Sequence, residues 1–223
     1  DGTDLRFQHV EAHDAARDVL LRQGDLHDAE AGVAISVFER FERTLADDPA
    51  THTFPRAMKE AGYATIHAGK FGNSPKKITE EFDRSVDPGH SEGVADAVID
   101  FIRTRPAEMP MFIYMAGPEP HDPQYAPDEF YAQYKPKDMP LPHAFAPYHP
   151  FDNGWLTGRD EMTLPFPRTP ENIRGKRARY YASVAYLDAQ FGRVVQTLKD
   201  SGEFDNTIFV IATLSSSLAP SPH

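Results

Sequence analysis

The chain of 223 residues is acidic, with 34 aspartates and glutamates against 23 lysines and arginines and a formal net charge of -11. This balance, together with the lack of a basic stripe, argues against nucleic acid or an anionic membrane surface as a partner. The chain has no cysteine, which excludes disulfides, thiolate zinc sites and cysteine nucleophiles. No apolar run approaches the ~18–20 residues that span a bilayer, and the first residues do not form a signal segment.

The first 50 residues carry the weakest pattern. Helical periodicity over residues 10–21 and 33–45 predicts a divergent helical segment. No convincing buried strand is visible within it, so we expect the main domain to span residues 51–212.

From residue 51 onward, predicted helices and strands alternate. A helix with Thr53 as its N-cap precedes a strand over residues 63–68. A second helix begins at Ser91 and precedes the apolar run 111–116, which has the composition of a strand buried on both faces. This order predicts right-handed crossovers and an α/β fold with a mainly parallel sheet flanked by helices.

Residues 117–170 are dense in proline, and only 128–134 has a helical pattern there. A flexible linker is one interpretation of such a segment. Its aromatic residues instead favour an ordered excursion over the carboxyl edge of the sheet, because long segments without regular structure in compact domains are usually functional.

A long helix is predicted from Pro170 to about Ser201, with Tyr180, Tyr181 and Tyr186 interpreted as core residues. A turn then leads into an apolar strand over residues 208–212. The Ser- and Pro-rich residues 213–223 have the composition of a disordered tail.

His121 lies in a loop just beyond the predicted strand 111–116. In open α/β sheets, ligands bind outside the carboxyl ends of the strands, which makes this histidine a candidate site residue. The alternative is an ordinary histidine on a solvated turn, since position in a fold is by itself a weak indication of function.

Three segments, in the same order along the chain, resemble the sulfatase family of the alkaline phosphatase superfamily. Residues 54–63 followed by Gly69-Lys70 resemble its "LPxxLKxAGYxTxxxGKWH" signature. Residues 120–123, Pro-His-Asp-Pro, are similar to its sulfate-contacting histidine loop. Residues 180–188, with the Asp-Asn-Thr-Ile segment 205–208, resemble the long helix and strand that precede metal ligands in the family.

This resemblance implies an alkaline phosphatase-like fold and a sulfuric ester hydrolase that acts on a sulfated small molecule or glycan. The family uses a divalent cation, usually Ca²⁺, and a formylglycine nucleophile made from Cys or sometimes Ser. Lys70 would contact the sulfate and the nucleophile, and His121 would contact sulfate or donate a proton to the leaving oxygen. Family members are commonly exported.

The sequence differs from the family pattern at the positions of the nucleophile and the metal ligands. Residues 36–40 have Ser and Arg at the spacing of the nucleophile motif but lack its proline, so we interpret them as coincidence. Asp4 is the one remaining candidate metal ligand near the start, and the later ligand positions hold Leu214, Ser215 and Ser216. We therefore expect a sulfatase domain that is incomplete at both ends, does not bind Ca²⁺ at full strength, and is inactive as given.

Two further hypotheses stay open from the sequence. The chain could be a non-catalytic remnant that binds an anion or a partner protein, or a related phosphodiesterase or phosphonate hydrolase. The abrupt change after residue 212 also suggests a shifted reading frame or a splice into unrelated sequence.

Overall fold

The computed structural model describes residues 33–37, 53–71, 76–148 and 166–211, with 150, 151, 154, 156, 158 and 161–164 between them. Its elements in chain order are β1 Val33–Val37, α1 Phe54–Glu60, β2 Ala64–Gly69, α2 Lys76–Thr79, β3 Arg84–Val86, α3 Ser91–Thr104, β4 Met111–Ala116, α4 Asp128–Tyr131, η2 Pro136–Asp138, η3 Glu161–Thr163, α5 Pro170–Asp200, η4 Phe204–Asn206 and β5 Thr207–Ile211. None of the helices in these ranges has the length and apolar composition needed to cross a membrane.

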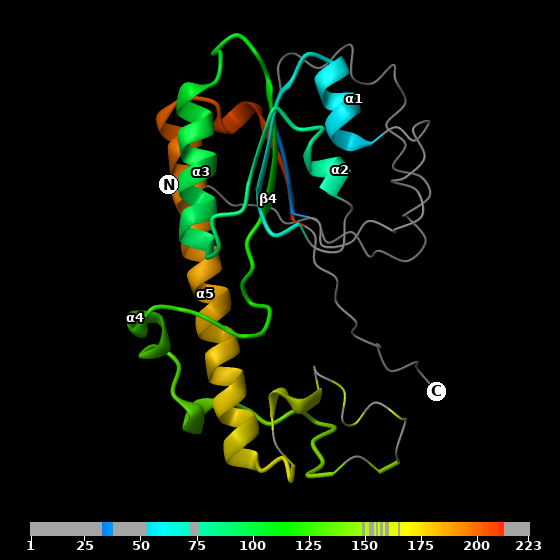
Figure 1. Ribbon diagram of the computed structural model, residues 1–223. Helices are drawn as coiled ribbons and strands as arrows, with labels where there is room; N and C mark the ends of the chain where they lie inside the picture. Colours follow the sequence, from blue (N-terminus) through cyan, green and yellow to red (C-terminus); the bar gives the residue numbers. More distant parts are fainter. Residues whose placement is uncertain are drawn as a thin grey trace, which may run out of the picture. The chain divides into compact units, whose positions relative to one another are not determined.

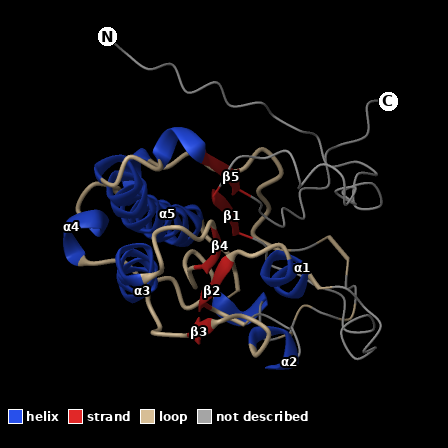
Figure 2. Ribbon diagram, turned by 90° about the horizontal axis from the view of Figure 1, so that it is seen from above, coloured by secondary structure: helices blue, strands red, loops and turns tan. Residues whose placement is uncertain are grey.

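The strands form one sheet in the order β3-β2-β4-β1-β5, and every pair is parallel. Helices α3 and α5 cover one face of this sheet, and α1 and α2 cover the other (Figure 2). The expectation of a parallel α/β sheet flanked by helices is therefore confirmed.

The larger apolar core lies between the sheet and the α3–α5 layer. Ile66 of β2 and Ile113 of β4 are fully buried there, against Val98 of α3 and Leu198 of α5. A smaller cluster on the other face joins Met58, Phe82 and Phe112. β4 is buried almost throughout because it lies inside the sheet and between the two helical layers.

The prediction of a helix over residues 33–45 is wrong for the first five of these residues. Residues 33–37 form β1, which pairs with β4 on one side and β5 on the other. A short apolar run such as Val-Ala-Ile-Ser-Val does not distinguish a helix from a strand by periodicity, and pairing with two strands decides the outcome. The sheet therefore includes residues before position 51. Residues 38–45, like the predicted helix over 10–21 and the tail 213–223, lie outside the described residues.

The sequence pattern missed β3 and α2, which lie in the polar stretch before Ser91. β3 has only three residues, and Asp83 just before it is held by polar contacts. Its carboxylate accepts one hydrogen bond from the Thr65 backbone N–H at 2.9 Å and another from the Thr65 hydroxyl at 3.0 Å. Such polar contacts leave no hydrophobic pattern in the sequence. The strands β2, β4 and β5 and the helices α1, α3, α4 and α5 begin and end within about three residues of the expected positions, whereas the short helices η2 and η3 were not predicted.

Gly69 allows the end of β2 to lie directly against the end of β4. Its φ is +114°, and a Cβ at this position would lie 2.0 Å from the carbonyl oxygen of Ala116. That oxygen accepts a hydrogen bond from the Lys70 N–H at 2.8 Å. Gly117 is as restricted, because its Cβ would lie 2.5 Å from the Ser91 hydroxyl at the start of α3. The ends of two strands and the start of one helix therefore meet at two glycines.

We predict that Gly69→Ala lowers the free energy of unfolding by at least about 2 kcal/mol more than Gly62→Ala does. Both glycines have positive φ, but a Cβ at Gly62 meets nothing within 4 Å. Gly62→Ala therefore carries only the backbone strain, about 1–2 kcal/mol. Urea unfolding of the two variants measures the difference, and equal losses would contradict the close approach at Gly69.

Candidate functional site

The carboxyl ends of β2, β3 and β4 face the same edge of the sheet because these strands are parallel neighbours. In the described part of the chain, the loops that leave β2, β3 and β4 at this edge begin with Lys70, run from Asp87 to His90, and run from Gly117 to His121. Both catalytic residues expected from the sequence lie on these loops. Asp4, the expected metal ligand, lies outside the described residues.

Lys70 is held in place through its backbone at the end of β2. Its N–H is fixed on Ala116, and the residue is half-buried. Within the described ranges, its ammonium group has no hydrogen bond and no ion-pair partner. A half-buried cation without a counter-charge favours binding of an anion, because water screens it less than it would a fully exposed charge.

His121 lies beyond β4 in a turn closed by its own N–H, which donates to the Pro118 carbonyl at 3.0 Å. The peptide bonds before Pro120 and Pro123 are cis. The imidazole is exposed, and its Nδ1 lies 2.7 Å from the Asp122 carbonyl oxygen. Since a carbonyl only accepts, Nδ1 carries the hydrogen and Nε2 is left to exchange a proton with a ligand.

Lys70 and His121 are brought to the same edge but do not touch. The Lys70–Ala116 hydrogen bond joins the start of one loop to the strand that carries the other. No hydrogen bond links the two side chains. Both side chains therefore lie on loops at the carboxyl edge of adjacent strands, β2 and β4.

Glu119 is a residue at this edge that the sequence analysis missed. Its side chain is almost fully buried, and its carboxylate accepts hydrogen bonds from the Ser91 N–H at 3.0 Å and from the Ser91 hydroxyl. It also lies 3.0 Å from Nδ1 of His90, whose ring stacks on Tyr125 at 3.8 Å between centroids. Glu119 and Ser91 are 28 residues apart, so no local pattern signals the contact.

His67 is another residue that the sequence analysis missed, and its side chain is buried rather than exposed at the carboxyl edge of the sheet. It lies on β2 with its ring stacked between Phe71 and Tyr114, and Nδ1 is 3.2 Å from the Ser85 hydroxyl. Burial lowers the pKa of His67, while a backbone hydrogen bond with Lys70 and the charge of Asp87 oppose this effect. The imidazole is therefore neutral near pH 7 and acts as part of the packing.

The described residues do not fit the calcium site that the resemblance implies. Ca²⁺ takes roughly 6–8 oxygen ligands. At this edge Glu119 is committed to Ser91 and His90, and Asp122 is paired with Lys176. No group of three or more His, Asp or Glu side chains in the described ranges is arranged to hold a metal. No chemical step through calcium follows from these residues.

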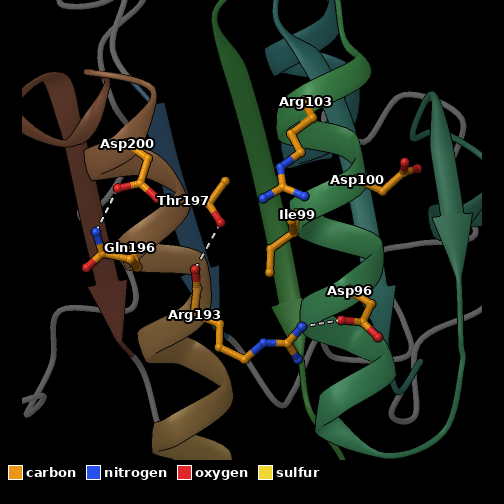
Figure 3. Close-up of a pocket in the computed structure, with 8 residues that line it drawn as sticks. All are labelled: Asp96, Ile99, Asp100, Arg103, Arg193, Gln196, Thr197 and Asp200. Carbon is orange, nitrogen blue, oxygen red and sulfur yellow. Dashed lines mark hydrogen bonds and ion pairs between the residues drawn. The ribbon is translucent and has the colours of Figure 1, made fainter.

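A groove of about 440 Å³ lies elsewhere, between α3 and α5 (Figure 3). It contains neither Lys70 nor His121. Its charged side chains partly neutralise one another, since Arg193 pairs with Asp96. We therefore place the candidate site at the carboxyl edge and not in this groove.

Comparison with solved structures first identifies the class of fold. One similar structure was solved in complex with its substrate D-glucosamine-2-N,6-O-disulfate; it has a TM-score of 0.55 and 17% identity, over 82% of this chain and 58% of that one. The phosphonate monoester hydrolase of Agrobacterium radiobacter has a TM-score of 0.52 and 16% identity, over 82% of this chain and 55% of that one. The chain has the α/β fold of the alkaline phosphatase-like sulfatases.

The family itself follows from the sequence match. The Sulfatase family model matches residues 43–213, so this chain belongs to the sulfatase family. An arylsulfatase of Clostridium perfringens is 28% identical over 120 residues, which cover 54% of this chain and 25% of that protein. An arylsulfatase of Klebsiella aerogenes is 25% identical over 240 residues, covering 78% of this chain and 49% of that protein. The chain thus spans half or less of the length of these curated relatives.

We predict that Glu119→Gln lowers the free energy of unfolding by about 1.5–3 kcal/mol, the range for hydrogen bonds to a charged group. The substitution keeps the shape but removes the charge that accepts from Ser91. Glu92→Gln, an exposed change in the same first turn of α3, is the control and should cost less than about 0.5 kcal/mol. Equal effects in chemical unfolding would show that the buried contact contributes nothing.

We also predict that stability falls as the pH drops below about 6.5, the ordinary histidine pKa. The pKa of His67 is lowered in the folded state, so the unfolded chain takes up the proton first and gains stability relative to the folded one. Melting temperatures from pH 7.5 to 5.5 should therefore fall less steeply in His67→Phe than in the unmodified chain. A His67→Phe profile parallel to that of the unmodified chain would contradict this assignment.

Proposed function

We propose that this chain carries the anion-binding edge of a sulfuric ester hydrolase, with Lys70 and His121 as the residues that contact the sulfate ester. The observation that carries the proposal is the Lys70 ammonium, which has no ion-pair partner among the described residues and is half-buried at the carboxyl edge of a sulfatase-family sheet. The arylsulfatases among its relatives support a sulfate monoester as the ligand class.

The chemistry of a sulfate monoester matches these two side chains. Hydrolysis breaks the bond between sulfur and the bridging oxygen, and that oxygen leaves with negative charge unless it is protonated. Lys70 acts as a fixed positive charge against the non-bridging oxygens. In its imidazolium form His121 donates the Nε2 proton to the leaving oxygen and becomes the neutral imidazole, whose Nδ1–H stays on the Asp122 carbonyl.

We further propose that this chain, as given, binds its ligand without turning it over. A formylglycine cannot be made from cysteine here because the chain has none, and the residues 36–40 lack the motif's proline. Of the carboxylates at the described edge, Glu119 and Asp122 already have protein partners. Lys70 and His121 alone supply charge and a proton, but neither supplies the nucleophile.

A sulfated sugar is the substrate class that we favour for the complete protein. The solved neighbour with the highest TM-score among those quoted was bound to a disulfated glucosamine, which supports this choice by analogy. The related hypothesis of a phosphonate or phosphodiester hydrolase rests on the shared fold with the Agrobacterium enzyme, and a tetrahedral phosphonate probe separates the two.

The test is a thermal-shift titration with sodium sulfate at constant ionic strength. We expect sulfate to raise the melting temperature by several degrees near 10 mM, and the Lys70→Ala/His121→Ala double variant to lose most of this rise. Lys199→Ala, which removes an exposed lysine from the far end of α5, is the matched control and should keep it. An unchanged melting temperature in the unmodified chain would refute the anion site.

The same preparations test turnover. An aryl sulfate incubated with Ca²⁺ should release no phenol above the level of buffer. Calcium-dependent release that survives Lys70→Ala would contradict the assignment of Lys70. A phenylphosphonate that raises the melting temperature more than sulfate does would favour the phosphonate hydrolase.

A further inference from the structure

A buried carboxylate supports an exposed histidine at the carboxyl edge of the sheet. Oε1 of Glu119, two residues before His121 on the loop after β4, lies 3.0 Å from Nδ1 of His90. The Glu119 side chain is 3% exposed, whereas that of His90 is 57% exposed. The other carboxylate oxygen of Glu119 accepts from the N–H and the hydroxyl of the buried Ser91. His90 is therefore the exposed end of a hydrogen-bonded chain whose other members are buried.

The ring of His90 is also held on its face. It stacks on Tyr125, with 3.8 Å between the ring centroids and 22° between the ring planes. The chain after β4 crosses α5 on its way to α4 (Figure 1), and Tyr125 of this segment is fixed there: its carbonyl accepts from the Ser183 hydroxyl at 2.8 Å, and its ring packs edge-on against the buried Tyr186. Exposed side chains ordinarily change rotamer within nanoseconds, so the contacts with Glu119 and Tyr125 together fix the direction of this imidazole.

His90 lies at the same junction of the fold as Lys70. It is the N-cap residue of α3, and its carbonyl accepts from the Val94 N–H at 3.2 Å. A Cβ on Gly69, the residue bonded to Lys70, would lie 3.2 Å from Cγ2 of Val94. Only about one turn of helix, ~5.4 Å, therefore separates His90 from the residue that touches the end of β2. His90 and Lys70 thus flank the same junction of the carboxyl edge.

The hydrogen-bond chemistry of the His90–Glu119 pair decides what it can bind. An ionised carboxylate only accepts hydrogen bonds, so the proton between the two residues belongs to Nδ1 of His90. Nε2, on the opposite side of the ring, has no hydrogen-bond partner in the part of the chain that the structure describes. In the neutral imidazole Nε2 is an acceptor, and the pair carries one negative charge. When the imidazole is protonated the pair has no net charge, so neither form attracts an anion.

We propose that His90, positioned by Glu119, accepts a hydrogen bond through Nε2 from a hydroxyl group on the alcohol portion of the sulfate ester. This inference rests on the proposed sulfatase function and adds to it a residue that selects for ligands with a hydroxyl group near the ester. Charge separates the two parts of the ligand: Lys70 attracts the sulfate, and the His90–Glu119 pair fits a neutral donor. Free sulfate has no hydrogen-bond donor, so it cannot make this contact.

The tautomer of His90 tests the geometry without any ligand. Long-range ¹H–¹⁵N NMR above about pH 8, where an ordinary histidine is neutral, should find the proton of His90 on Nδ1. In Glu119→Gln the amide oxygen is still required by the Ser91 N–H, so the NH₂ group faces Nδ1 and the proton should move to Nε2. The His90→Phe spectrum assigns the resonance by its absence. A proton on Nε2 in the unmodified chain would overturn the proposal.

Selectivity is tested by titration calorimetry with sodium sulfate, glucose 6-sulfate and cyclohexylmethyl sulfate, the last of which has a six-membered ring but no hydroxyl group. His90→Phe keeps an aromatic ring against Tyr125 and removes Nε2. It should weaken binding of glucose 6-sulfate about three- to tenfold, the effect of one neutral hydrogen bond, and change Kd for the other two ligands less than about twofold. His143→Phe replaces an exposed histidine of the proline-rich excursion and is the control, which should leave all three Kd values within about twofold.

Two results in this series would also overturn the proposal. One is an unchanged Kd for glucose 6-sulfate in His90→Phe. The other is an equal loss for glucose 6-sulfate and cyclohexylmethyl sulfate, which would show that His90 only maintains the shape of the loop. Failure of the proposed function has a different result, since free sulfate would then not bind the unmodified chain at all. Sulfate that binds normally, with no selective loss for glucose 6-sulfate in His90→Phe, refutes the role of His90 alone.

Discussion

The contact between the ends of β2 and β4 and the start of α3 is the constraint on which the candidate site depends. It requires two glycines, since a side chain at Gly69 would overlap the Ala116 carbonyl and one at Gly117 would overlap Ser91. The buried carboxylate of Glu119 then binds the first residue of α3 and holds the helix against both strands. The backbone of Lys70 is fixed by this arrangement, while its ammonium group has no ion-pair partner among the described residues.

Helix α5 connects the core to the carboxyl edge of the sheet. The second half of α5 buries Val194 and Leu198 against the sheet, and the first half holds Lys176. Lys70 and His121 lie on the loops after β2 and β4, and the Lys176–Asp122 ion pair joins α5 to the second of these loops.

The sequence was informative where the pattern was long or strongly apolar. β4 and α5 were predicted almost to the residue, and the parallel sheet followed from their order along the chain. β1 was predicted as a helix because a run of five residues, four of them apolar, has no distinguishing period, and pairing with the neighbouring strands makes it a strand. Tyr180 and Tyr181 fit an apolar helical stripe, but the packing partner changes midway along α5 and leaves them exposed.

The candidate site was predictable only in part for a similar reason. Lys70 and His121 could be placed at strand ends from the sequence alone, because parallel strands bring their carboxyl ends to one edge. The contacts of Glu119 with Ser91, and of His67 with Ser85, join residues 28 and 18 positions apart. Such contacts depend on how α3 and β3 pack against the rest of the sheet, and local composition does not encode that packing.

The most direct test of the central claim is a crystal structure of this chain with selenate, whose anomalous scattering identifies a sulfate-like anion. The account predicts a selenate within hydrogen-bond distance of Lys70 Nζ at the carboxyl edge, with His121 on its other side. Selenate found only elsewhere on the chain, with Lys70 left to water, would contradict it.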